Sequence, residues 1–397
     1  MSANLNDMVQ SKMLNNNGSI FSQMNKLTDK PGIIDMAVGK SEFPCPPALT
    51  ELASKYIRLG YNNFAPMEGI PELRSEIATR TKTLYGYAYN PETEINITAG
   101  HIQTVTTAIS SVVKEDDEVI VFEPAFESYV PAILINGGRP KFVSLKLPDF
   151  HIDWEELRKM ISSKTRMIIV NSPHNPTGAV LSDEDMVQLQ RITNGTNIVI
   201  LSDEIFESFV YDNKKHQSVA RYEKLAKRSF IVSSFGPAYN VNGWGIACCL
   251  APENLMRDFR NVHQFQVFNA NTPLQYALAE FISNDESYLE VSEIYQGKRN
   301  YFKRLMVGSP FGIEPTQGSY FQLLNYSDLS NEKDTDFALR LLNEYGLATI
   351  PLSAFFHEKT KLRMVRLCFA KTNETLEKAS EILKSVKAVT LVENPVR

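Results

Sequence analysis

The segment Asn171-Ser172-Pro173-His174-Asn175-Pro176-Thr177-Gly178 follows directly on the short apolar run Met167–Val170. The run is rich in β-branched residues, which favours a buried strand. The prolines and the final glycine do not continue a strand, so the segment predicts a loop at the strand's carboxyl end. Ligands bind at the carboxyl ends of strands in open α/β sheets. The segment therefore predicts a ligand-binding loop, and the sequence around it should supply the rest of the sheet.

Further short apolar runs bounded by turns occur on both sides of this segment. They are Ile95–Ala99, Glu118–Phe122, Asn197–Leu201 and Phe230–Ser233. Segments with helical spacing, such as Thr104–Val113 and Asp183–Ile192, lie between them. This alternation predicts an α/β fold with a mainly parallel sheet between helices.

A short turn-like sequence follows each of the predicted strands. These sequences are Thr98–Ile102, Phe122–Phe126, Asn171–Gly178, Ser202–Phe206 and Ser233–Pro237. Any one of them is explained by an ordinary turn, but in a parallel sheet all five would meet in one crevice. We therefore expect one binding site at this edge of the sheet.

The character of the sequence changes after about residue 285. A charged amphipathic helix is predicted over Ser287–Leu305, followed by two short strands and two closing helices. The strands are Ser319–Leu324 and Met364–Phe369, and the helices are Asp334–Tyr345 and Asn373–Lys387. We predict a large domain over 46–284 and a smaller α+β domain formed by 1–45 and 285–397, joined by the long helix.

Composition excludes several classes of protein. The 397 residues are 43% hydrophobic and 22% charged, which is typical of a globular chain, and the net charge of −5 argues against a nucleic-acid partner. No apolar run reaches 18 residues and the N-terminus lacks a signal peptide, so we expect no membrane partner and a cytoplasmic location. The cysteines have no metal-binding spacing, so no metal is expected, and Cys248-Cys249 predicts packed strand residues.

Five stretches together resemble the fold-type I aminotransferases, which use pyridoxal 5′-phosphate, over nearly the whole chain. They are Asn63–Gly69, Asn171–Gly178, Ser202–Glu204, Asn240–Trp244 and Arg366–Lys371. The nearest branch is the methionine and kynurenine aminotransferase-like group. The resemblance implies a mainly parallel, seven-stranded-type sheet, a smaller α+β domain, a role in amino acid metabolism and a homodimer.

The resemblance also assigns positions for holding the cofactor. Asp203 matches the carboxylate on the ring nitrogen, Asn175 a donor to the ring's phenolic oxygen, Phe126 the ring-stacking side chain and Ser234 a phosphate ligand. For the substrate, Arg366 matches the arginine that holds the α-carboxylate, with Asn175 and Gly39 beside it.

Other positions depart from the family pattern. Pro237 stands where the family has the lysine that forms the Schiff base, and proline has no amine. Gly245 replaces the arginine or lysine on the cofactor phosphate, and two expected tyrosines are Phe206 and Phe64, the latter offered by the neighbouring chain of the dimer. After Gly100, small phosphate-loop residues have become His101 and Ile102. These losses predict a degenerate site with no cofactor, or with only weak, non-covalent binding of pyridoxal phosphate.

Two new polar residues are candidates for catalysis in such a site. Lys40 could replace a lost positive charge, and His101 could act as a general base. A surface lysine and a loop histidine are the simpler interpretations.

Three functions remain open from the sequence. The first is an enzyme that acts on an amino acid or 2-oxo acid held by Arg366 without pyridoxal phosphate. The second is a non-catalytic, ligand-binding pseudoenzyme, and the third is an aminotransferase that uses another base. Aromatic residues expected near the entrance favour an apolar or aromatic ligand: Phe43, Phe64, Phe126, Phe206, Tyr239, Phe355 and Phe356.

Overall fold

A seven-stranded sheet forms the centre of the computed structural model, which describes residues 18–284, 290–358 and 360–389. The strand order is β2-β8-β7-β6-β5-β3-β4, and only β8 runs antiparallel to its neighbours. The strands are β2 Ile95–Thr98, β3 Glu118–Glu123, β4 Arg139–Ser144, β5 Thr165–Asn171, β6 Val199–Asp203, β7 Ser229–Ser234 and β8 Ala247–Leu250. The predicted α/β fold with a mainly parallel sheet is confirmed.

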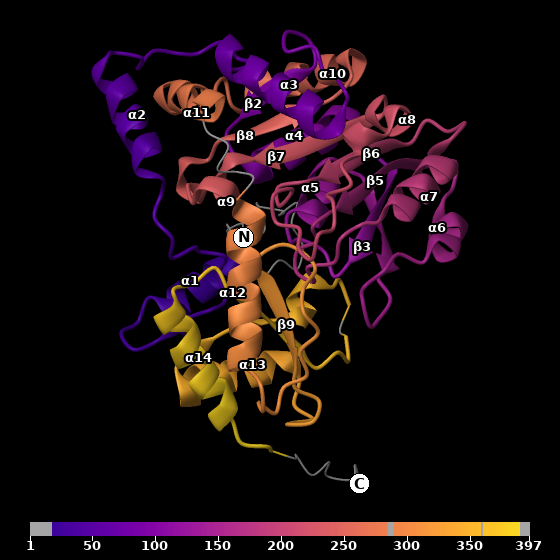
Figure 1. The fold of residues 1–397 in the computed structure, drawn as a ribbon. Helices are drawn as coiled ribbons and strands as arrows, with labels where there is room; N and C mark the ends of the chain where they lie inside the picture. The colour runs from indigo at the N-terminus through magenta and orange to yellow at the C-terminus, as the bar shows by residue number, and fades with distance from the viewer. Residues whose placement is uncertain (1–17, 285–289, 359, 390–397) are drawn as a thin grey trace, which may run out of the picture.

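Helices cover both faces of this sheet (Figure 1). The core on one face combines residues of α2 Pro47–Arg58, α3 Pro71–Tyr85, α6 Trp154–Met160, α7 Asp183–Thr193, α8 Glu223–Ala226 and α11 Thr272–Asn284. The other face packs against α4 His101–Val112, α5 Tyr129–Ile135 and α10 Glu253–Gln266. Successive strand residues point to opposite faces, so Cys248 belongs to the first core and Cys249 to the second. Both cysteines are buried and free, as expected of packed strand residues.

Two of the strands differ from the sequence-based expectation. Strand β4 is half polar and lies at the edge of the sheet, so its sequence contains no apolar run that would predict a strand. Strand β8 was expected only from its cysteine pair. The other predicted strands occur within a few residues of their expected ends.

A second lobe is built on smaller sheets. It contains the antiparallel sheet β11-β12-β9 and the parallel pair β1-β10. The strands are β1 Ile34–Asp35, β9 Phe321–Asn325, β10 Leu347–Ala348, β11 Ile350–Pro351 and β12 Met364–Cys368. The helices are α1 Ile20–Thr28, α12 Val291–Leu305, α13 Asp334–Tyr345 and α14 Asn373–Ser385.

Helix α12 runs from the side of the large sheet into this lobe (Figure 1). Residues 287–289 of the helix predicted from Ser287 lie outside the described residues. The core of the lobe combines α12, α13 and α14 with residues from near the N-terminus, such as Met36. The proposed division at residues 45 and 285 stays a prediction. Among the described helices, none has the length and hydropathy that crossing a membrane requires.

Candidate functional site

The ends of neighbouring strands bring the predicted site residues together. Asn171 at the end of β5 pairs in register with Asp203 at the end of β6. Ser234 ends β7 and pairs with Ala247, which in turn pairs with Thr98 at the end of β2. The loops after these strands therefore open at one edge of the sheet, as expected.

Asp203 is the buried acceptor at the centre of this edge, with an exposed fraction of 1%. Its Oδ2 lies 2.6 Å from Nε2 of His101 and also accepts the hydroxyl hydrogen of Tyr129. Its backbone carbonyl accepts from the Asn171 amide over 2.9 Å and from the Ser172 N–H over 3.1 Å. The carboxylate is thus held rigidly and already has two donors on one oxygen.

His101 is the first residue of α4 and does not lie in a loop. The helix begins three residues earlier than predicted, because Gly100, with φ of +97°, makes the turn into it. The imidazole lies against the ring of Phe126, with ring centroids 5.2 Å apart. His101 therefore faces the candidate site, whereas the side chain of Lys40 is exposed.

Arg366 lies on β12 and is fully buried. Its Nη1 donates to Oδ1 of Asn175 over 2.8 Å, and its Nη2 donates to the carbonyl of Ala37 over 2.7 Å. Its Nε has no hydrogen-bond partner among the described residues. Burial lowers the pKa of Arg366 to about 10, which leaves the guanidinium charged at neutral pH.

Aromatic rings surround this guanidinium. Its central carbon lies 3.9 Å from the ring centroid of Phe321 and 5.2 Å from those of Phe21 and Phe355. Such contacts stabilise a buried cation without satisfying its N–H groups. The guanidinium is therefore suited to bind a carboxylate that carries an apolar group.

Gly39 lies next to the same aromatic rings. Its carbonyl accepts from the Tyr320 hydroxyl over 3.3 Å. A Cβ at this position would lie 3.1 Å from Cζ of Phe321, so a larger residue would press on the ring beside Arg366. Asn175 contacts Arg366 directly, whereas Gly39 lies beside Phe321, one of the rings around Arg366.

The short helix α9, Phe235–Tyr239, begins where β7 ends. Ser234 caps it, accepting from the Gly236 N–H over 3.2 Å. Pro237 is buried in this helix and offers no amine. Gly245 lies close to Gly100, since a Cβ on Gly100 would be 3.5 Å from Cα of Gly245.

The aromatic residues expected near the entrance divide into several groups. Phe126 and Phe355 lie at the site, and Phe355 stacks edge-on with Phe21 at 6.2 Å. Phe64 is 82% exposed and contacts Phe268. Phe206 packs edge-on against Phe321, the ring nearest Arg366, and against Tyr320. The remaining ones pack elsewhere: Phe43 against Tyr295, Tyr239 against Phe281, and Phe356 at the edge of the core around Phe355.

Three residues of the site were not expected from the sequence. Tyr129 lies three residues after Phe126, and this short separation was the only sequence feature that indicated that the two side chains lie close together. Phe21 and Phe321 are far from the recognised stretches along the chain and meet Arg366 only in the folded molecule.

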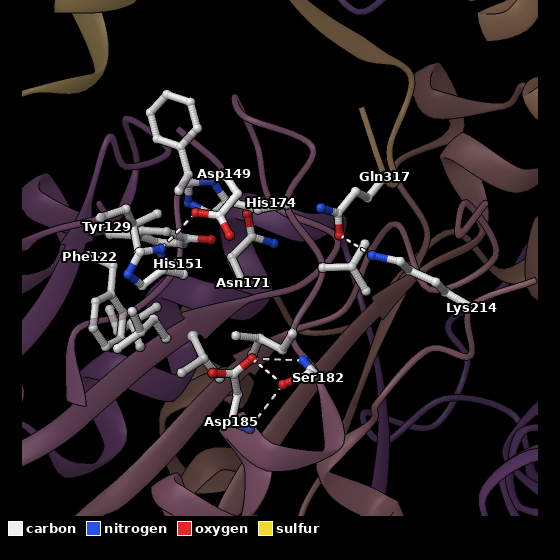
Figure 2. A pocket seen from close by; sticks show the side chains of 18 residues that line it. Phe122, Tyr129, Asp149, His151, Asn171, His174, Ser182, Asp185, Lys214 and Gln317 are labelled. Atoms are coloured by element: carbon white, nitrogen blue, oxygen red, sulfur yellow. Dashed lines mark hydrogen bonds and ion pairs between the residues drawn. The ribbon is translucent and has the colours of Figure 1, made fainter. Parts of the chain in front are cut away.

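A cavity of about 330 Å³ has Tyr129 in its wall (Figure 2). Its walls include Asn171, His174 and the Asp149–His151 pair. Asp203 and Arg366 do not line it, whereas Tyr129 and Asn171, which both contact Asp203, do. Burial lowers the pKa of His174 to about 4, and its Nδ1 pairs with the Thr177 hydroxyl at 2.7 Å, so this histidine is a neutral structural residue.

Comparison with known proteins gives consistent matches along the whole chain. The family model "Aminotransferase class I and II" matches residues 31–383. Methionine aminotransferase of Escherichia coli K12 is 37% identical over 378 residues, covering 95% of this chain and 98% of the relative. Kynurenine–oxoglutarate transaminase of Dictyostelium discoideum is 30% identical, covering 93% and 94%. A solved structure of Escherichia coli YbdL, reported with a methionine aminotransferase function, has a TM-score of 0.91 at 37% identity and covers 95% of this chain and 99% of that one.

These relatives correct the expectation that no cofactor binds. Aminotransferases of this class depend on pyridoxal phosphate, and a relative 37% identical over nearly the full chain indicates that cofactor here too. The expectation rested on the residues that differ from the family pattern, whereas far more of the chain matches it.

The residues at the site fit pyridoxal phosphate, provided that the side chain of His101 moves away from Asp203. Asp203 offers a buried acceptor for the ring nitrogen, and Phe126 offers a stacking face. The N-terminus of α4 has no side-chain cap and can accept a phosphate, with Ser234 nearby in the fold. The imidazole of His101, however, holds the carboxylate that the ring nitrogen requires.

Proposed function

The chain belongs to the class I and II aminotransferase family, and from that premise we propose that it binds pyridoxal phosphate without a covalent bond at residue 237. With that cofactor, it transfers an amino group between an amino acid and a 2-oxo acid. The observation that carries the proposal is the buried guanidinium of Arg366, whose Nε has no partner among the described residues. A carboxylate accepts well from two guanidinium N–H groups at once.

The contacts of Asn175 and Asp203 support a site in which some residues hold the cofactor and Arg366 holds the substrate. Oδ1 of Asn175 accepts from Arg366, which leaves its amide nitrogen to donate to the phenolic oxygen of the cofactor. Asp203 would accept from the protonated ring nitrogen and keep the proton there. Phe126 would cover one face of the ring, and Ser234 with the first turn of α4 would hold the phosphate. When bound, pyridoxal phosphate supplies an aldehyde that combines with amino groups and a ring that withdraws electrons from Cα.

Pro237 affects how a proton could be moved at the Cα atom of the substrate. A proline side chain neither takes nor gives a proton, so another group must move the proton if turnover occurs. Lys40 is exposed after Gly39 and remains a candidate for that role or for replacing a lost charge. His101 also faces the site and is the other candidate.

The same proline favours a second candidate function. Without an amine at residue 237, the chain would bind the cofactor and a carboxylate ligand and would not convert them. This candidate keeps every contact described for Arg366 and Asp203 and differs only in turnover.

Turnover measured by mass spectrometry separates the two functions. The protein is incubated with pyridoxal phosphate, an amino donor taken from the relatives' substrates (methionine or kynurenine) and 2-oxoglutarate. Formation of glutamate in the wild type but not in Arg366→Ala supports the aminotransferase. Ligand binding without glutamate formation supports the binding protein, and absence of binding by any of these compounds contradicts both.

Three properties of the proposed protein rest on the sequence and the family. We propose a homodimer in which Phe64 of each chain lies at the neighbouring site, consistent with the 82% exposure of Phe64 in a single chain. We propose a small carboxylate with an apolar or aromatic side chain as substrate, because rings surround Arg366. A cytoplasmic location, without nucleic-acid or membrane partners, also remains a proposal.

A further inference from the structure

Resting on the proposed function, we propose that His101 is an internal competitor of the cofactor. Its imidazole takes the hydrogen bond on Asp203 that the ring nitrogen of pyridoxal phosphate requires. The cofactor therefore binds only when the side chain of His101 turns away.

The hydrogen bonds of Asp203 carry the first step of the argument. Its Oδ2 accepts from Tyr129 and pairs with Nε2 of His101 at 2.6 Å. One carboxylate oxygen has two good acceptor directions, and these two side chains use both. A ring nitrogen can therefore reach this oxygen only by replacing one of them, and the other oxygen, Oδ1, accepts from the backbone N–H of Ile205 over 3.4 Å.

The aromatic contact shows which of the two is replaced. The ring of Phe126, which would cover the cofactor, lies 5.2 Å from the imidazole of His101 at an angle of 40°. The imidazole thus holds the hydrogen bond on Oδ2 and lies tilted against the ring on which a pyridine ring would stack. Tyr129 also contacts Phe126, at 5.8 Å, but edge-on, with the ring planes at 72°.

His101 is also the group that can move. The side chain of Asp203 is 1% exposed, and its strand lies in the middle of the sheet between β5 and β7. Tyr129 is buried at 3%. His101 stands at the first position of α4 with 14% of its side chain exposed, so rotation about its side-chain bonds can release Asp203.

Binding of pyridoxine 5′-phosphate tests this inference. This probe has the ring nitrogen and the phosphate but no aldehyde, so surface lysines cannot trap it covalently. We expect His101→Ala to bind it at least tenfold more tightly than the wild type, because the competing hydrogen bond to a charged group is gone. Inorganic phosphate needs no contact with Asp203, and its affinity should change less than about threefold.

His151→Ala is the matched control. His151 pairs with Asp149 at the same 2.6 Å but is 55% exposed and lines the cavity beside Tyr129. Its removal should leave the affinity for pyridoxine 5′-phosphate unchanged. A second variant, His101→Ser, should show the same gain as alanine and serves if the alanine variant does not fold.

A third readout uses the unaltered protein. In ¹⁵N-labelled wild type, the Nε2 resonance of His101 should shift when pyridoxine 5′-phosphate is added, because its bond to Asp203 breaks. Unchanged affinity in both His101 variants, or a resonance that does not move on saturation, overturns the inference while leaving the proposed function intact. Failure of the wild type and of all variants to bind the probe contradicts both.

Discussion

Nη1 of Arg366 donates to Oδ1 of Asn175 over 2.8 Å, and this bond joins the small antiparallel sheet to the loop after β5. The two residues are 191 positions apart in the chain. With the second bond from Nη2 to the carbonyl of Ala37, it fixes the plane of the guanidinium and leaves Nε for a ligand. The charge available to a carboxylate ligand therefore depends on Asn175 remaining neutral.

Asn175→Asp should weaken carboxylate binding at Arg366. The new carboxylate would accept from Nη1 in place of the amide oxygen and neutralise the guanidinium internally. We expect 3-phenylpropanoate, a carboxylate with an aromatic ring and no amine, to bind about ten- to a hundredfold more weakly, as measured by calorimetry. The thermal midpoint should stay the same or rise.

Asn325→Asp is the control for the added charge. Asn325 ends β9 in the same small sheet, and its Oδ1 accepts from the Ser327 N–H, a contact that aspartate keeps. This variant should bind 3-phenylpropanoate as the wild type does. Equal affinity in Asn175→Asp would mean that Arg366 is not the carboxylate ligand.

Pro237→Lys should give the site an amine that reacts with pyridoxal phosphate. Residue 237 lies in the first turn of α9, where the N–H of a proline is not needed and a lysine brings no backbone conflict. After incubation with pyridoxal phosphate and reduction with borohydride, peptide mapping should find the modification at residue 237.

Ala238→Lys is the matched control for this experiment. It adds the same amine one residue further along α9, on a different face of the helix. Labelling of residue 238 to the same extent as residue 237 would show that the reaction reports exposure of the lysine and not a shaped cofactor site.

The sequence sufficed where neighbours in the chain determine the structure. The run Met167–Val170 and the turn residues after it predicted β5 and its loop, because apolar patterning and proline act locally. The cysteine pair on β8 was assigned correctly to a packed strand for the same reason. The charged edge strand β4 was missed because it lacks such a pattern.

The contacts that matter most for binding could not be predicted in this way. His101 and Asp203 are separated by 102 positions; the strand pattern predicted that their two turns share one edge of the sheet, but not that the two side chains bond to each other. Phe21 reaches Arg366 from the opposite end of the chain. Sequence likeness assigned positions to Asp203 and Arg366, but only the fold shows that His101 pairs with the first and that aromatic rings surround the second.

Phe64→Asp should convert a dimer into a monomer. Phe64 is 82% exposed, Phe268 is 55% exposed, and their rings meet 5.4 Å apart to form an apolar patch. In analytical ultracentrifugation the wild type should have about twice the chain mass of 44.8 kDa, and the variant should have the chain mass. Ile294→Asp, which places a charge on the exposed face of α12, should leave the mass unchanged. A wild type at the mass of one chain would contradict the dimer.

Acid should destabilise the protein through His263. This histidine is fully buried in α10, and neither ring nitrogen has a partner among the described residues. Burial lowers its pKa to about 4, whereas an unfolded chain has a histidine pKa of about 6.5. Between these values the unfolded state binds a proton that the folded state does not, so stability is full above pH 6.5 and falls as the pH drops towards 4.

His263→Leu should remove this part of the pH dependence. From pH 6.5 to 5 the free energy of unfolding of the wild type, measured with urea, should fall by about 1.5 kcal/mol more than that of the variant. His174, whose pKa burial also lowers to about 4, adds a loss of the same sign in both proteins. Glu123, whose pKa burial raises, acts in the opposite direction in both.

At pH 7 the variant should be as stable as the wild type or more so, because leucine leaves no buried nitrogen without a partner. Parallel stability curves for the two proteins over this interval would show that His263 takes up a proton in the folded state.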